Sequence, residues 1–190
     1  MRAVAPVLLA VRFPLAGPPP PEAKRPAHAP AISTHSRKAT TLSPLYDEAA
    51  DQYKRILAMD ENNVNAYVWL IDTLAFQGKE TEAFEWFIRS LNSRRTDEKI
   101  IRAYESAFQT RGWDEVLREQ AKRFEETDEV YFRGAGIHAQ IGNKDEAFEY
   151  LEKSFQRREL WMYYLRVHPL VDSLRDDPRF ADLLARVESR

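Results

Sequence analysis

The stretch Gly78–Leu91 has the sequence GKETEAFEWFIRSL, and Gly142–Phe155 repeats it as GNKDEAFEYLEKSF. The tetrapeptide Glu-Ala-Phe-Glu stands in both copies, 64 residues apart. Gly112 lies 34 residues after the first glycine and 30 before the second, which indicates a unit of about 34 residues with one shortened copy. A repeat of this length is typical of stacked two-helix units. The sequence therefore predicts an all-α fold built from repeated pairs of antiparallel helices.

Apolar residues within this region recur at intervals of three and four, which places them on one face of a helix. One stripe precedes the first copy of the repeat and another lies inside it: Tyr67, Leu70, Ile71 and Leu74, then Phe84, Phe87, Ile88 and Leu91. A glycine closes each of three helical patterns, at Gly78, Gly112 and Gly142. Glycine suits the left-handed residue that ends a helix, so we predict a short turn at each of these positions.

Proline divides the chain in two. Nine of the eleven prolines lie in residues 1–44, and residues 45–168 contain none. Proline removes a backbone donor and clashes with the preceding helical turn, so a long proline-free stretch favours a helical body. We predict a repeat domain at 44–190 and a disordered, proline-rich basic tail at 1–43. The tail is interpreted as a linker, with a docking peptide for a proline-reading domain as the alternative.

Charge and composition narrow the class of protein. The chain has 28 basic and 30 acidic residues, and six of the basic ones but only one acidic one lie in the tail. The body therefore holds 22 basic and 29 acidic residues, which argues against a nucleic-acid binder. The absence of cysteine excludes disulfides and thiolate chemistry. No apolar run approaches the ~20 residues that span a bilayer. We predict a cytoplasmic protein without a membrane partner; the alternative is export or organelle import directed by MRAVAPVLLAVRF at the N-terminus.

The stretch Tyr46–Asn63, YDEAADQYKRILAMDENN, resembles part of a known protein family. This stretch resembles the second helix and exit turn of a tetratricopeptide repeat, with Tyr46, Ala49 and Tyr53 at the family's aromatic, alanine and aromatic positions. The turn Asp60–Asn63 takes the place of the usual Asp-Pro-Asn-Asn, with glutamate instead of proline. The resemblance covers about 44–190 and implies an α-solenoid of antiparallel helix pairs.

The end of the chain strengthens this resemblance. Residues 151–187 are similar to the C-terminal close of repeat arrays in bacterial transcriptional regulators, adenylate cyclases and serine/threonine kinases. There a short helix, expected here at Pro169–Arg175, precedes an Asp-Pro-Arg-Phe turn at Asp177–Phe180. A last helix, expected at Ala181–Val187, then caps the array. Proline after two aspartates is in any case favourable chemistry for starting a helix.

The resemblance also implies a binding surface, because the first helix of each pair lines a concave groove in this family. Side chains off the packing stripe of these helices form the predicted partner-binding set: Asn65, Val68, Trp69, Asp72, Phe76, Lys99, Arg102, Phe132 and Gln140. Trp69 and Phe76 are the expected anchors, since aromatic residues dominate binding hot spots. Lys99 and Arg102 are expected to take a carboxylate. In the alternative, neighbouring helices or the tail cover the aromatics, and the charges belong to a solvated face.

No catalytic or metal-binding pattern accompanies these features. His28 and His35 lie in the tail, His138 falls on a packing stripe, and His168 precedes a proline in a turn. No pair has metal-ligand spacing, and there is no glycine-rich phosphate loop. We therefore expect no enzymatic activity, no metal and no cofactor.

The function predicted from the sequence is a protein–protein interaction module that binds a partner polypeptide in the groove. One alternative is a sensor or regulatory fragment that acts with a separate transcription-regulator or kinase chain. Another is self-association through the N-terminal half-repeat, since Tyr46–Met59 has no evident first helix before it.

Overall fold

The computed structural model describes residues 43–125 and 130–189, and every regular element in these ranges is a helix. The elements are α1 (Ser43–Met59), α2 (Val64–Phe76), α3 (Glu80–Ser93), α4 (Glu98–Arg111), α5 (Trp113–Glu125), α6 (Tyr131–Gln140), α7 (Lys144–Gln156), the 3₁₀ helices η1 (Leu160–Tyr164) and η2 (Pro169–Leu174), and α8 (Pro178–Glu188). The predicted all-α class is confirmed. The predicted tail lies outside the described residues except for Ser43, at which α1 begins.

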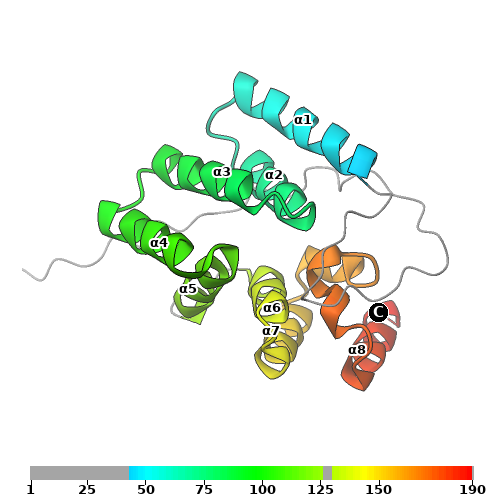
Figure 1. The fold of residues 1–190 in the computed structure, drawn as a ribbon. Helices are drawn as coiled ribbons and strands as arrows, with labels where there is room; N and C mark the ends of the chain where they lie inside the picture. Colours follow the sequence, from blue (N-terminus) through cyan, green and yellow to red (C-terminus); the bar gives the residue numbers. More distant parts are fainter. Residues whose placement is uncertain (1–42, 126–129, 190) are drawn as a thin grey trace, which may run out of the picture.

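Helices that follow one another in the chain pack against one another. The closest pairs are α1 with α2, α2 with α3, α4 with α5, and α6 with α7, and α5 also contacts α6. Figure 1 shows this succession from α1 at the top of the view to α8 at the lower right. Near the C-terminus η2 packs on α6, and α8 packs on α7. The array is thus closed at this end by its own last segment.

The turns between helices repeat as the sequence predicts. Gly78, Gly112 and Gly142 have φ values of 77°, 65° and 85°, which is the left-handed region where glycine avoids a steric cost. The amide of Lys79 donates to the carbonyl of Leu74 at 2.9 Å, and 64 residues later the amide of Asn143 donates to the carbonyl of His138 at 2.9 Å. The turn after α2 and the turn after α6 therefore share one hydrogen-bonding pattern.

The buried positions repeat as well. Ala83 and Ala147 are both 0% exposed, and Tyr67 and Tyr131 are 6% and 7% exposed. The stripe predicted on α2 is buried along its length, whereas the stripe on α3 is half-buried. His138 is a core residue, 1% exposed, with its ring 5.0 Å from that of Tyr150. The structure is thus a repeat-like helical fold whose buried residues form two hydrophobic clusters, one over α1–α5 with Ile137 of α6 and one over α6–α8.

The C-terminal elements begin where local chemistry favours them. The carboxylate of Asp177 accepts a hydrogen bond from the amide of Arg179 at 3.0 Å, and Pro178 occupies the first turn of α8. The last helix therefore begins at Pro178, three residues earlier than predicted. The short helix expected at Pro169–Arg175 is present as the 3₁₀ helix η2. Among the helices that the structure describes, none has the length and apolar character needed to cross a bilayer.

Candidate functional site

Trp69, the expected anchor on α2, packs against the C-terminal segment of the same chain. Its ring lies 5.3 Å from the ring of Trp161 in η1 and 6.2 Å from the imidazole of His168. Trp69 remains half-buried rather than sealed. Of the two possibilities weighed from the sequence, the structure favours coverage by a neighbouring element.

Phe132 on α6 completes this contact from the other side. Its ring lies 5.2 Å from His168 in an edge-on arrangement and 6.5 Å from Trp161. Tyr164 adds a further ring, 6.2 Å from Trp161. These five residues, Trp69, Phe132, Trp161, Tyr164 and His168, form what we call the aromatic cluster. It joins α2, α6 and the C-terminal segment.

A buried ion pair lies beside the aromatic cluster. Arg133 on α6 donates to the carboxylate of Asp72 on α2, across 61 residues of sequence. The two side chains are only 19% and 10% exposed, so both charges are largely removed from water. Removing charges from water is costly unless they pair closely. The pair therefore specifies how α2 and α6 meet.

Arg175 organises the backbone that carries His168. It pairs with Asp172 at 2.7 Å, and it donates to the backbone carbonyls of Arg166 and, at 3.3 Å, of His168. These bonds tie the start of η2 to its end. They hold the backbone of His168 in place, so that its ring stays in contact with the other rings of the aromatic cluster.

His168 is a neutral imidazole at ordinary pH. Burial lowers its pKa from 6.5 to about 4, because a charged ring would lose its hydration there. The nearby cations Arg133 and Arg175 act in the same direction, while Asp72 and Asp172 oppose it. Its Nδ1 accepts a hydrogen bond from the amide of Leu170 at 3.3 Å, so the ring caps the first turn of η2.

Two of the predicted groove residues are not at a groove surface. Phe132 and Asp72 are both buried. The physical reason is that the C-terminal segment packs over this part of α2 and α6, so first-helix side chains that lie off the packing stripe still find an internal partner. Phe132 and Asp72 therefore make contacts inside the fold and do not line a groove.

The remaining predicted residues keep some access to solvent. Asn65, Val68 and Phe76 on α2 and Gln140 at the end of α6 are half-buried. Lys99 and Arg102 on α4 are exposed, and Arg102 pairs with Glu98 at 2.5 Å. Within the described residues, no ion pair or ring contact joins these two cations to the aromatic cluster. The structure thus brings Trp69, Asp72 and Phe132 together and leaves Lys99 and Arg102 apart from them.

Several residues of this region were not among those predicted, including Arg133, Trp161, Tyr164 and His168. The available signal was the aromatic density of LWMYY at Leu160–Tyr164. The aromatic residues of this segment do not recur with the 3.6-residue period of an α-helix. The segment forms a 3₁₀ helix, which has three residues per turn.

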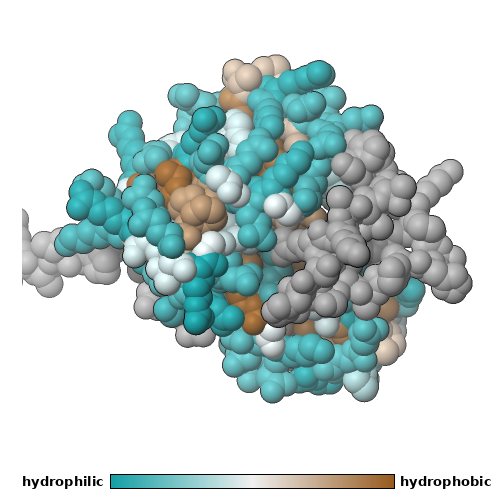
Figure 2. Space-filling model, viewed as in Figure 1, coloured by the Kyte–Doolittle hydropathy of each residue, from teal (hydrophilic) through white to brown (hydrophobic). Residues whose placement is uncertain are grey.

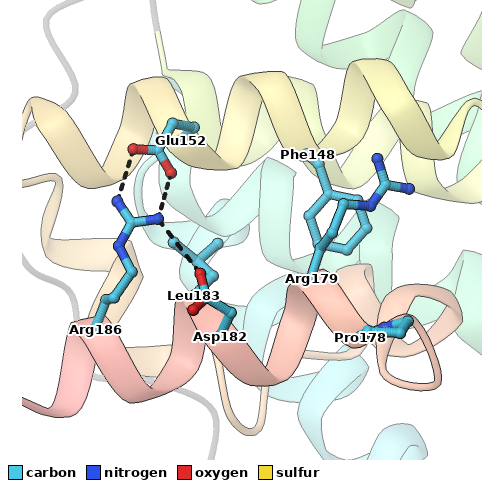
Figure 3. Close-up of a pocket in the computed structure, with 7 residues that line it drawn as sticks. All are labelled: Phe148, Glu152, Pro178, Arg179, Asp182, Leu183 and Arg186. Atoms are coloured by element: carbon cyan, nitrogen blue, oxygen red, sulfur yellow. Dashed lines mark hydrogen bonds and ion pairs between the residues drawn. The ribbon is translucent and has the colours of Figure 1, made fainter.

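A hollow between α7 and α8 is occupied by paired charges (Figure 3). Arg186 makes two hydrogen bonds with Glu152, at 2.8 and 2.9 Å. Arg179 donates a hydrogen bond to Asp145 at 2.7 Å. The guanidinium groups also lie over the rings of Phe155 and Phe148, at 4.5 and 4.2 Å from the ring centres. Each arginine thus meets a carboxylate and a phenylalanine, seven residues apart on each helix. This arrangement fastens α8 to α7 and leaves neither cation free for an outside anion.

Three apolar side chains of the C-terminal segment are exposed to solvent. Leu160, Tyr163 and Val167 are 51%, 75% and 55% exposed. Solvent-exposed apolar side chains that gather on one segment are common at interaction sites. We call these three residues the C-terminal patch.

No metal centre is indicated in the part of the chain that the structure describes, since no group of three or more His, Asp or Glu side chains there could hold an ion. No match was found to a protein-family model, to a curated protein or to a solved structure. The assignment of a function therefore depends on the geometry of this chain alone.

Proposed function

We propose that this chain is a tetratricopeptide-type α-solenoid of antiparallel helix pairs that binds another polypeptide. The observation that carries the proposal is the recurrence of the α2–α3 unit as α6–α7. Equivalent residues fill equivalent buried positions, with Ala83 and Ala147 at 0% and Ser90 and Ser154 at 2% and 0% exposed. Stacked two-helix units of this kind bury a shared core and present a long surface formed by one helix of each unit. Such surfaces suit extended or helical peptides.

The proposed contact surface uses the predicted residues that remain accessible on α2 and α4. Val68 and Phe76 are half-buried apolar side chains, and Lys99 and Arg102 are exposed cations. The pairing of Arg102 with Glu98 is an exposed contact between residues one helical turn apart, which contributes little and is easily exchanged for a partner's carboxylate. The favoured ligand is therefore a peptide with an apolar anchor followed by an acidic residue.

The experiment begins with selection of binding peptides from a display library on the immobilised full chain. The dissociation constant of a selected peptide is then measured for the wild type, Phe76→Ala and Arg102→Glu. We expect each variant to weaken binding about tenfold or more, which corresponds to about 1.4 kcal/mol. Arg118→Glu on α5 is the matched control, since Arg118 is also exposed and receives the same charge change.

Two outcomes contradict the proposed surface. If Tyr163→Ser abolishes binding while the α2 and α4 variants do not, the ligand uses the C-terminal patch instead. If the display library yields no peptide that binds the folded chain, the peptide-binding function itself is wrong.

A further inference from the structure

One edge of α1 is only partly covered, although Ile56 on this edge packs on the core. Ala49, Gln52, Ile56 and Met59 follow one another at intervals of three and four residues, so they lie along one side of the helix. Met59 is 81% exposed, Gln52 is exposed, and Ala49 and Ile56 are half-buried. We call this stripe the open edge of α1. Moderately hydrophobic atoms show at the top of Figure 2, where α1 ends, and further hydrophobic atoms show elsewhere on the same face.

Two of these positions, those of Ala49 and Ile56, are sealed in the other units. Ala49 and Ile56 stand 34 residues before Ala83 and Ser90, which are 0% and 2% exposed, and the next equivalents, Ala147 and Ser154, are both 0% exposed. The difference has a plain cause. In those units α2 packs against α3, and α6 packs against α7. Within the described residues, no helix precedes α1 to cover its open edge as α2 covers α3 and α6 covers α7.

The other edge of α1 is already engaged by the body of the protein. Lys54 pairs with Glu82 of α3 at 2.7 Å, and Asp47 pairs with Lys79, just before α3, at 2.7 Å. Ala50 and Leu57, between the two edges, are 3% and 6% exposed and face the core with α2. The orientation of α1 is thus fixed by polar and apolar contacts, and its open edge points away from α3.

We propose that two copies of this chain meet through their open edges, with the two α1 helices antiparallel about a two-fold axis near Gln52. In this register the small Ala49 of one copy lies opposite the large Ile56 of the other, and the reverse contact follows by symmetry. A two-fold interface requires such a self-complementary patch. Each helix then takes the place that the preceding helix fills in the other units.

The charges beside the open edge select this arrangement. Glu48 and Arg55 are exposed on α1 and, within the described residues, neither forms an ion pair. Antiparallel pairing places Glu48 of each copy opposite Arg55 of the other. In a parallel two-fold pair, opposite flanks of the two helices would face each other, so Glu48 and Arg55, which share one flank, would not meet. The stripe is therefore complementary to itself in both volume and charge, which favours a second copy over an unrelated helix.

The test is the mass of the full chain in solution, measured by light scattering over a series of concentrations. We expect the wild-type mass to rise from 22.1 kDa toward twice that value. Glu48→Lys and Arg55→Glu should each weaken the dimer about tenfold or more, because each places two like-charged pairs in the interface. An equimolar mixture of the two variants should dimerise again. In the mixed dimer the introduced lysine of one copy meets the introduced glutamate of the other, and the original pair forms at the second contact.

Matched controls carry the same charge changes on other helices. Glu105→Lys on α4 and Arg118→Glu on α5 alter exposed side chains and should dimerise as the wild type does. Circular dichroism checks that all variants keep their helices. The proposal is overturned by a wild type that stays at 22.1 kDa at every concentration, by single variants that dimerise normally, or by a mixture of the two that remains monomeric.

Discussion

His168 is a titratable group held neutral by its surroundings. Its pKa falls from 6.5 to about 4 on burial, so between these values the unfolded chain binds a proton that the folded chain excludes. The contribution of His168 to stability is therefore unchanged above the unfolded pKa, decreases as the pH falls below about 6.5, and stops changing below about 4.

We predict that His168→Asn makes the protein less sensitive to acid. Asparagine can still accept the hydrogen bond from the amide of Leu170, but it does not titrate. Between about pH 7.5 and about pH 4.5 the wild type should lose about 2 kcal/mol more unfolding free energy than the variant. Urea unfolding at each pH measures this difference. Parallel losses in the two proteins would show that His168 is accessible to protons in the fold.

The Asp72–Arg133 pair leads to a second prediction at the same scale. Asp72→Ala leaves the guanidinium of Arg133 largely buried without its carboxylate, and we expect a loss of about 3 kcal/mol in unfolding free energy. The double variant Asp72→Leu with Arg133→Leu should recover most of this loss, because neither charge then remains. Glu98→Ala, which breaks an ion pair that is mostly exposed, should cost less than about 0.5 kcal/mol.

At the scale of elements, η2 and α6 approach each other closely. A Cβ atom added at Gly136 would lie 2.8 Å from the Cβ of Leu170, so η2 cannot keep its position if this residue has a side chain. Because Gly136 has no side chain, η2 can pack closely on α6, and the rings of the C-terminal segment can contact Trp69 and Phe132.

Gly136→Ala is the prediction for this contact. In an ordinary helix the change stabilises by about 1 kcal/mol. Here we expect a net destabilisation of about 1–3 kcal/mol, because the obstructing atom is next to the backbone and cannot rotate away. The fluorescence of the tryptophans should also change, since Trp161 moves with the C-terminal segment. An alanine variant as stable as the wild type, with unchanged fluorescence, would contradict the packing of η2 on α6.

At the scale of the molecule, positions that are equivalent in the repeat differ in solvent exposure, and the most exposed of them lies in α1. Ala83 and Ala147 are sealed between helices, while Ala49 stands on the open edge of α1. The same substitution should therefore have different costs at the three sites.

We predict that Ala83→Trp and Ala147→Trp each destabilise the fold by about 3 kcal/mol or more, since overpacking a close helix contact forces the backbone apart. Ala49→Trp should cost less than about 1 kcal/mol in the monomer, because the ring can turn into solvent. Thermal unfolding at low protein concentration, where a dimer contributes least, measures all three. Equal losses at the three positions would show that α1 is enclosed like the other helices.

Features that depend on neighbouring residues could be predicted from the sequence. The stripe from Tyr67 to Leu74 is buried as its spacing indicates, and Gly78 and Gly142 have the left-handed backbone expected of them. The burial of His138 also followed from its place on a stripe. Each of these depends on helical periodicity or on the chemistry of a single turn, and both are local properties of the chain.

Features that depend on distant segments could not be predicted in the same way. Trp69 meets Trp161, which is 92 residues further along, and whether Trp69 and Phe132 face a groove or an internal partner depends on where η1 and η2 come to rest. Neither 3₁₀ helix has a helical period that indicates its buried side. The coverage of α2 and α6 by the C-terminal segment is therefore a property of the folded chain, because it results from packing between residues that no sequence pattern connects.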